Sequence, residues 1–176
     1  MRFAEGDLEM DIPDVVDGGK FDGDGHGLNR CMKAVDFVVE LADRYLFIEF
    51  KDPQHPHATP ESRDEFIRRL EAGQLDEDLK YKYRDSFLYE WASGRAGKPI
   101  DYLVLIALDT LDETQLLTRT EALERNLPQH GPDDQPWSRE IVRACGVFNL
   151  ESWNRELPHY PVTRIGAGPR NTGNAP

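Results

Sequence analysis

The chain has 176 residues, of which 39% are hydrophobic and 10% aromatic, which suits one folded domain and excludes a disordered chain. Its formal net charge of −12 repels a nucleic-acid backbone unless cations gather on one face. Two cysteines are too few for a disulfide framework or a cysteine metal cluster, and no apolar run approaches the ~20 residues that cross a bilayer. We therefore expect a cytoplasmic protein with no membrane partner, with a single domain at 1–165 and a disordered tail at 166–176.

The first 30 residues are acidic and rich in glycine, and we expect them to form a loop. Residues 1–14 show only a poor helical pattern. The stretch at 17–27 is best explained as a solvated turn cluster. A second possibility is that it overhangs a site formed further along the chain, with Lys20 or His26 facing substrate.

Two strand-like runs follow, at residues 33–41 and 45–51. The polar break at 42–44 suits a hairpin between them. Side chains alternate between the two faces of a strand, so Glu49 and Lys51 share one face of the second run. The other face of that run is apolar and carries Leu46, Ile48 and Phe50.

Folding at the hairpin would bring Asp36 or Glu40 across from Glu49 and Lys51. Two carboxylates on adjacent strands can hold one Mg²⁺ and leave positions open for a phosphate, provided that they lie less than ~8 Å apart. Lys51 would then orient or help to deprotonate an attacking water, or stabilise the charge that develops on phosphorus. This arrangement predicts phosphodiester hydrolysis. The alternative is a solvated Glu–Lys pair on an exposed strand.

The two runs together read Asp-x12-Glu-x-Lys within apolar surroundings. This pattern resembles the PD-(D/E)xK nuclease superfamily, which has the restriction-endonuclease-like fold, over roughly residues 33–108. The resemblance implies that Asp36 and Glu49 bind Mg²⁺ or Mn²⁺ and that Lys51 is the catalytic lysine. Val35 stands where the name-giving pattern has proline.

Members of this superfamily often add a metal-binding glutamate from an N-terminal helix, and Glu5 or Glu9 could serve here.

Residues 61–93 are predicted to be helical, with a break near Gly73. In some nuclease-like families the helix after the Glu-x-Lys strand points a basic or amide side chain back at the active site. By this resemblance Lys82 is a candidate catalytic residue, and Lys80 or Arg84 would contact phosphate of the substrate. The alternative is an ordinary amphipathic helix with solvated basic residues.

The remaining pattern predicts an apolar central strand at 98–108 and a helix that Asp112 caps and that runs to about Asn126. Further elements are expected as a loop at 129–136, a short helix at 137–144, a strand at 146–150 and a helical turn at 151–157. The order of elements predicts an α/β or α+β fold, in which helices flank a mixed central sheet with a restriction-endonuclease-like core.

Three functions fit these features. The first is a metal-dependent endonuclease or exonuclease acting on nucleic acid, with DNA as the expected substrate. Its acidity is tolerable if the metal neutralises the carboxylates and if a groove is lined by Lys80, Lys82, Arg84, Arg95 and Lys98. The second is an acidic immunity or inhibitor-type protein that binds a basic partner. The third is a catalytically inactive nuclease-like subunit of a larger defence or mobile-element assembly, in which a partner protein supplies the basic surface.

Overall fold

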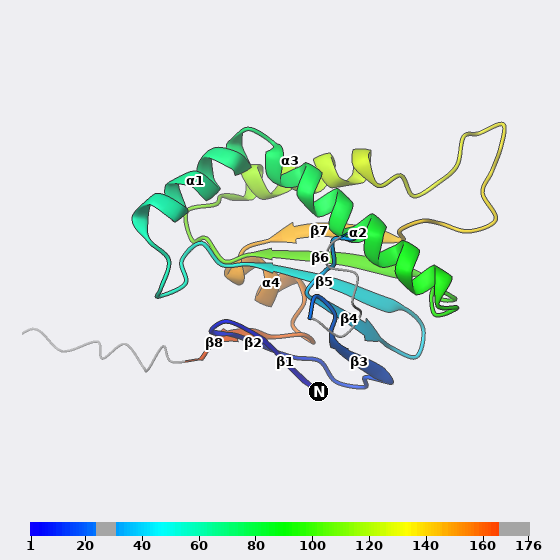
Figure 1. Ribbon diagram of the computed structural model, residues 1–176, viewed down its shortest axis with the longest axis horizontal. Coiled ribbons are helices and arrows are strands. Elements are labelled where there is room, and N and C mark those ends of the chain that lie inside the picture. The colour runs from blue at the N-terminus through cyan, green and yellow to red at the C-terminus, as the bar shows by residue number, and fades with distance from the viewer. Residues whose placement is uncertain (24–30, 166–176) are drawn as a thin grey trace, which may run out of the picture.

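The computed structural model describes residues 1–23 and 31–165, so the expectations for His26 and for the tail at 166–176 lie outside the described residues. The central layer is a five-stranded mixed sheet in the order β3-β4-β5-β6-β7 (Figure 1). β3 to β5 pair antiparallel, whereas β5, β6 and β7 run parallel. The strands are β3 (Asp17–Lys20), β4 (Phe37–Glu40), β5 (Tyr45–Lys51), β6 (Ile100–Ile106) and β7 (Ala144–Phe148).

Three helices cover one face of this sheet (Figure 1): α1 (Pro60–Glu71), α2 (Gln74–Ala92) and α3 (Glu113–Asn126). The mixed sheet flanked by helices confirms the predicted α/β or α+β class. Gly73 separates α1 from α2 with φ +71°, a left-handed conformation that glycine adopts without steric cost. The side chain of Asp112 accepts the Gln115 N–H at 2.8 Å and caps α3 as predicted. Over the described ranges, no helix combines the length and apolar character needed to cross a membrane.

A second layer packs on the opposite face of the central sheet (Figure 1). It consists of α4 (Leu150–Glu156) and a three-stranded antiparallel sheet of β1 (Arg2–Glu5), β2 (Leu8–Asp11) and β8 (Val162–Arg164). Its core includes Phe3, Leu8, Met10, Phe37, Phe50 and Trp153. The central sheet therefore has an apolar cluster on each face.

The loop predicted for residues 1–30 is wrong over 1–20, which form β1, β2 and β3. Alternate residues on β1 and β2 enter the core, because Phe3, Leu8 and Met10 are buried while their neighbours are more exposed. This period of two explains the poor helical pattern. No N-terminal helix presents Glu5 or Glu9, since both lie on strands.

The short helix predicted at 137–144 is also wrong, because the described chain there is irregular and enters β7 at Ala144. The backbone N–H of Arg143 donates to the Ile100 carbonyl at 2.8 Å, and its guanidinium pairs with Asp101 on β6. These contacts draw the segment alongside β6. Ile141 and Val142 pack against the core from this irregular segment, whereas Trp137 stays 41% exposed.

Candidate active site

The hairpin of β4 and β5 places Asp36 beside Glu49. Phe37 of β4 pairs with Ile48 of β5, so the next position of the same register sets Asp36 against Glu49. Glu40, the other candidate from the sequence, lies at the far end of β4 and forms an ion pair there with Lys98. The structure thus selects Asp36 as the carboxylate that faces Glu49.

Backbone contacts hold Asp36 in place. Its Oδ2 accepts the Phe50 N–H at 2.6 Å, and its side chain is almost completely buried. The preceding residue is also fixed, because the Val35 N–H donates to Ser86 Oγ of α2 at 3.0 Å. With one carboxylate oxygen bound to backbone, the other is directed toward the side chains of the site.

Two lysines converge on these carboxylates. Lys82 Nζ of α2 donates to Asp36 Oδ1 at 3.2 Å and to Glu49 Oε1 at 2.6 Å. Lys51 Nζ of β5 donates to the same Glu49 oxygen. Because both carboxylates lie within hydrogen-bonding distance of one nitrogen, they meet the ~8 Å requirement for sharing a cation. Asp36, Glu49, Lys51 and Lys82 therefore form one cluster, which we call the carboxylate–lysine cluster.

Burial dominates the electrostatics of Glu49, which has no exposed surface. Desolvation raises its pKa from 4.5 to about 7, although Lys51 and Lys82 oppose the increase. Its Oε2 has no hydrogen-bond partner. Burial on its own would lower the pKa of Lys82, but the charges and hydrogen bonds of Glu49 and Asp36 outweigh it and raise that pKa. Lys82 therefore stays positively charged at neutral pH, where Glu49 titrates.

The two lysines of the carboxylate–lysine cluster line a cleft of about 530 Å³ between α1, α2 and the end of β5, whereas the buried Asp36 and Glu49 lie behind them and are not part of its lining. We call it the α1–α2 cleft, and Lys51 and Lys82 are the less exposed of the four described cations in its lining. Charged side chains and an apolar surface complete its lining: Asp22, Lys33, Arg69, Asp78, Ala34, Phe66, Leu75 and Leu79. The N-terminal segment thus reaches the site through Asp22, and burial followed by repulsion from Asp36 raises the pKa of that carboxyl.

Lys80 and Arg84, predicted to contact phosphate, lie away from the carboxylate–lysine cluster. Residues two apart on a helix do not face the same side, so neither points with Lys82 toward the sheet. Lys80 pairs with Glu77 at 2.5 Å, and Arg84 is exposed. Neither lines the α1–α2 cleft. Their role in binding substrate stays a prediction.

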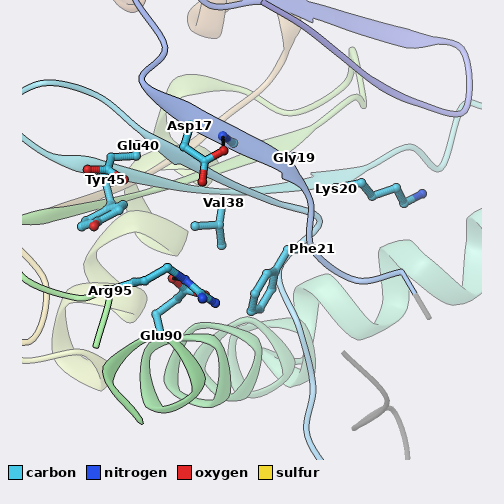
Figure 2. A pocket seen from close by; sticks show the side chains of 10 residues that line it. Asp17, Gly19, Lys20, Phe21, Val38, Glu40, Tyr45, Glu90 and Arg95 are labelled. Atoms are coloured by element: carbon cyan, nitrogen blue, oxygen red, sulfur yellow. Dashed lines mark hydrogen bonds and ion pairs between the residues drawn. The ribbon is translucent and has the colours of Figure 1, made fainter. Parts of the chain in front are cut away.

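A second pocket, of about 170 Å³, lies at the C-terminal end of α2, where Glu90 contributes to its lining (Figure 2). Arg95 projects into it and binds Glu90 through two hydrogen bonds of 2.9 and 2.8 Å, while Lys98 binds Glu40 nearby at 2.6 Å. Lys20 extends away from this pocket in Figure 2 and pairs with Glu5. Within the described residues, the five cations predicted to line one groove are therefore distributed over separate surfaces.

The donor atoms of the cluster suit a hard divalent cation. Asp36 Oδ1 and the unpaired Glu49 Oε2 are carboxylate oxygens, which Mg²⁺ and Mn²⁺ prefer. Residues 1–23 and 31–165 contain no group of three or more His, Cys, Asp or Glu side chains arranged as metal ligands. Glu9, one of the proposed additional ligands, pairs with Arg2 instead. The fit is to an ion held by two carboxylates, with water or phosphate oxygens in its other positions.

No family model, curated protein or solved structure matches this chain. The carboxylate–lysine cluster and the α1–α2 cleft are therefore the features of this chain that bear on its function.

Sequence reasoning missed polar residues of α2 that complete this region. Ser86 accepts the N–H of Val35, the residue before Asp36, and Asp78 binds Lys33 and Arg69 at the cleft. The available signal was helical spacing, because Asp78, Lys82 and Ser86 recur every four residues and so lie on one side of the helix.

Proposed function

We propose that this protein is a metal-dependent nuclease that hydrolyses phosphodiester bonds of nucleic acid, with DNA as the first substrate to test. The observation that carries the proposal is the convergence of Asp36 and Glu49 on Lys82, a residue that lines the α1–α2 cleft. Burying a carboxylate is costly, and Glu49 is fully buried with one oxygen unpaired. A protein that only masks a partner with its surface has no need of such a group.

Asp36 and Glu49 would hold Mg²⁺ or Mn²⁺. The bound ion would supply a water of lowered pKa and neutralise charge on the phosphate. Lys82, which stays protonated, would donate to a non-bridging phosphate oxygen and stabilise the charge that grows there in the transition state. Lys51, which lines the same cleft, would orient the attacking water or contribute to the same stabilisation.

The proposed reaction breaks one P–O ester bond and forms one bond between phosphorus and the water oxygen. The attacking water loses a proton, and the leaving alkoxide takes one up to become a hydroxyl. The products are a phosphate monoester end and a free hydroxyl end.

The charge of −12 does not prevent an acidic chain from binding nucleic acid locally. Four cations, Lys33, Lys51, Arg69 and Lys82, line the α1–α2 cleft, against two acidic residues in the same lining. A bound divalent ion would further offset Asp36 and Glu49. The phosphate-binding region therefore differs in charge from the whole chain.

A cleavage assay tests the proposal. Purified protein would be incubated with circular and linear single-stranded and double-stranded DNA and with RNA, in Mg²⁺ or Mn²⁺. We expect cleavage that a chelator abolishes and that falls by about 100-fold or more in Glu49→Gln and Lys51→Met. Lys98→Met is the matched control, because Lys98 binds Glu40 and lies outside the cleft. Equal cleavage by all variants would identify a contaminating nuclease and contradict the proposal.

The net charge of −12 is the observation that favours the second candidate, an acidic protein that binds a basic partner. In that case substitutions in the carboxylate–lysine cluster would leave the function of the protein unchanged. Absence of cleavage by a folded wild-type protein, with Glu49→Gln equal to wild type in every assay, would transfer support to this function or to an inactive nuclease-like subunit.

A further inference from the structure

The α1–α2 cleft is larger than a phosphate group requires. Its volume of about 530 Å³ falls in the range of small-molecule binding sites, ~300–1,000 Å³. Lys51 and Lys82 account for only two of the ten residues that line it in the described part of the chain. The remaining space therefore has room for a further portion of the substrate, next to the scissile phosphate.

The rest of the lining includes an apolar surface. Phe66 of α1 is partly buried against the core and contributes an aromatic ring, and Leu75 and Leu79 of α2 belong to the same lining. An aromatic ring can stack on any nucleobase, because every base has a π face. This surface suits a base better than it suits a phosphate or a solvated sugar.

Cations occur in the same lining. Asp78 binds both Lys33, at 2.6 Å, and Arg69. Two cations thus share one carboxylate, and the side chains of Lys33 and Arg69 remain 51% and 39% exposed. Their remaining N–H donors can bind a second phosphate. One cleft therefore combines the two lysines of the carboxylate–lysine cluster, an aromatic surface and a further cationic pair.

We infer that the α1–α2 cleft binds the nucleoside next to the scissile phosphate, with its base against Phe66 and the following phosphate at Lys33 and Arg69. A base that enters the cleft cannot remain in a duplex. The substrate class is consequently single-stranded nucleic acid or an unpaired end. This inference rests on the proposed nuclease function for the position of the scissile phosphate.

Nucleotide binding is the first test and needs no catalysis. Thymidine 5′-monophosphate and inorganic phosphate would be titrated into metal-free protein and followed by calorimetry. We expect Phe66→Ala to weaken nucleotide binding about tenfold and to leave phosphate binding unchanged. Phe66→Tyr should bind as wild type. Phe66→Leu, which keeps most of the apolar volume and secures the test if Phe66→Ala unfolds, should bind as weakly as Phe66→Ala.

The matched control is Ile67→Ala, since Ile67 is the next residue of α1 and packs on the core without lining the cleft. Nucleotide binding that is equal in Phe66→Leu, Ile67→Ala and wild type would overturn the inference.

Cleavage is the second test. We expect a single-stranded oligonucleotide to be cut about tenfold or more faster than a blunt duplex of the same sequence, and this preference to shrink in Phe66→Leu. Efficient cutting of the duplex interior, unaffected by Phe66→Leu, would overturn the inference while leaving the nuclease function intact. Nucleotide binding that depends on Phe66 without cleavage of any substrate would contradict the nuclease function and support the nucleoside site.

Discussion

Lys82 of α2 donates a hydrogen bond of 2.6 Å to Glu49 of β5, which lies 33 positions earlier in the chain. The same nitrogen reaches Asp36 at 3.2 Å, so one ammonium group joins the helix to β5 and to the residue that precedes β4. Glu49 is fully buried and keeps an oxygen without a partner. Structural ion pairs rarely leave a buried oxygen unpaired, because its desolvation is not compensated.

Replacing Glu49 should separate activity from stability. At pH 7 and above, burial makes the ionised form of Glu49 unfavourable in the folded protein even with both lysines present, and Glu49→Gln supplies a neutral side chain of the same shape, so we expect it to be no less stable than wild type. Cleavage should nevertheless fall by about 100-fold or more. Urea unfolding and initial cleavage rates measure the two effects. Glu40→Gln, at the far end of the same hairpin, should retain activity, and a large loss of stability in Glu49→Gln would contradict this account.

The stability of the metal-free protein should depend on pH through Glu49. Its pKa is raised from 4.5 to about 7 in the folded state, so between these values the folded protein holds a proton that the unfolded chain has released. The contribution of Glu49 to stability is therefore present at low pH and is lost as pH rises to about 7, by up to about 3 kcal/mol.

Unfolding free energies of wild type and Glu49→Gln, measured in chelator from pH 4.5 to pH 8, test this dependence. The unfolding free energy of Glu49→Gln should increase relative to that of wild type as the pH rises from 4.5 to 8. A difference that stays constant over the interval would show that Glu49 does not titrate there.

The two oxygens of Asp36 should have separable roles. Oδ2 accepts the buried Phe50 N–H at 2.6 Å, and Oδ1 faces Lys82. Asp36→Asn keeps an acceptor for Phe50 and should stay folded, whereas Asp36→Ala leaves that N–H unpaired and should lose about 1–3 kcal/mol of stability. Both variants should bind Mn²⁺ at least about tenfold more weakly. Thermal unfolding and Mn²⁺ titration distinguish the two roles, and unchanged Mn²⁺ binding in Asp36→Asn would exclude Asp36 as a ligand.

Arg164 connects the three-stranded sheet to the end of β5, and we expect this connection to stabilise the fold. It binds Asp52, the residue after Lys51, through two hydrogen bonds of 2.7 Å, and it also binds Asp7. Arg164→Met leaves two largely buried carboxylates facing each other and should destabilise the fold by about 3 kcal/mol. Arg2→Met removes an exposed pair and should change stability by less than about 0.5 kcal/mol. Equal urea midpoints for these two variants would contradict this role of Arg164.

Local patterns were sufficient to predict the elements that carry the site. The alternation of residues 45–51 fixed which side chains join Glu49 on one face, and Gly73 marked the break between two helices. Asp112 indicated the start of α3 for the same local reason, since capping involves neighbouring residues.

Long-range contacts explain what the sequence left open. β3, with sequence Asp-Gly-Gly-Lys, has no apolar alternation and is a strand only because it pairs with β4. β8 has three residues and forms by pairing with β2. Likewise, Lys80 and Lys82 are the same residue type on the same helix. Only the packing of α2 on the sheet decides which of them reaches Glu49.

The most direct test joins metal binding to catalysis. Cleavage rates of single-stranded DNA would be measured across a Mn²⁺ titration, with Mn²⁺ binding followed by electron paramagnetic resonance in the same samples of wild type and Glu49→Gln. We predict one site per chain in wild type, a cleavage rate that rises as that site fills, and loss of both the site and the activity in Glu49→Gln. A wild-type protein that binds no Mn²⁺, or cleavage that persists in Glu49→Gln, would contradict the assignment of Asp36, Glu49, Lys51 and Lys82 as a metal-dependent nuclease site.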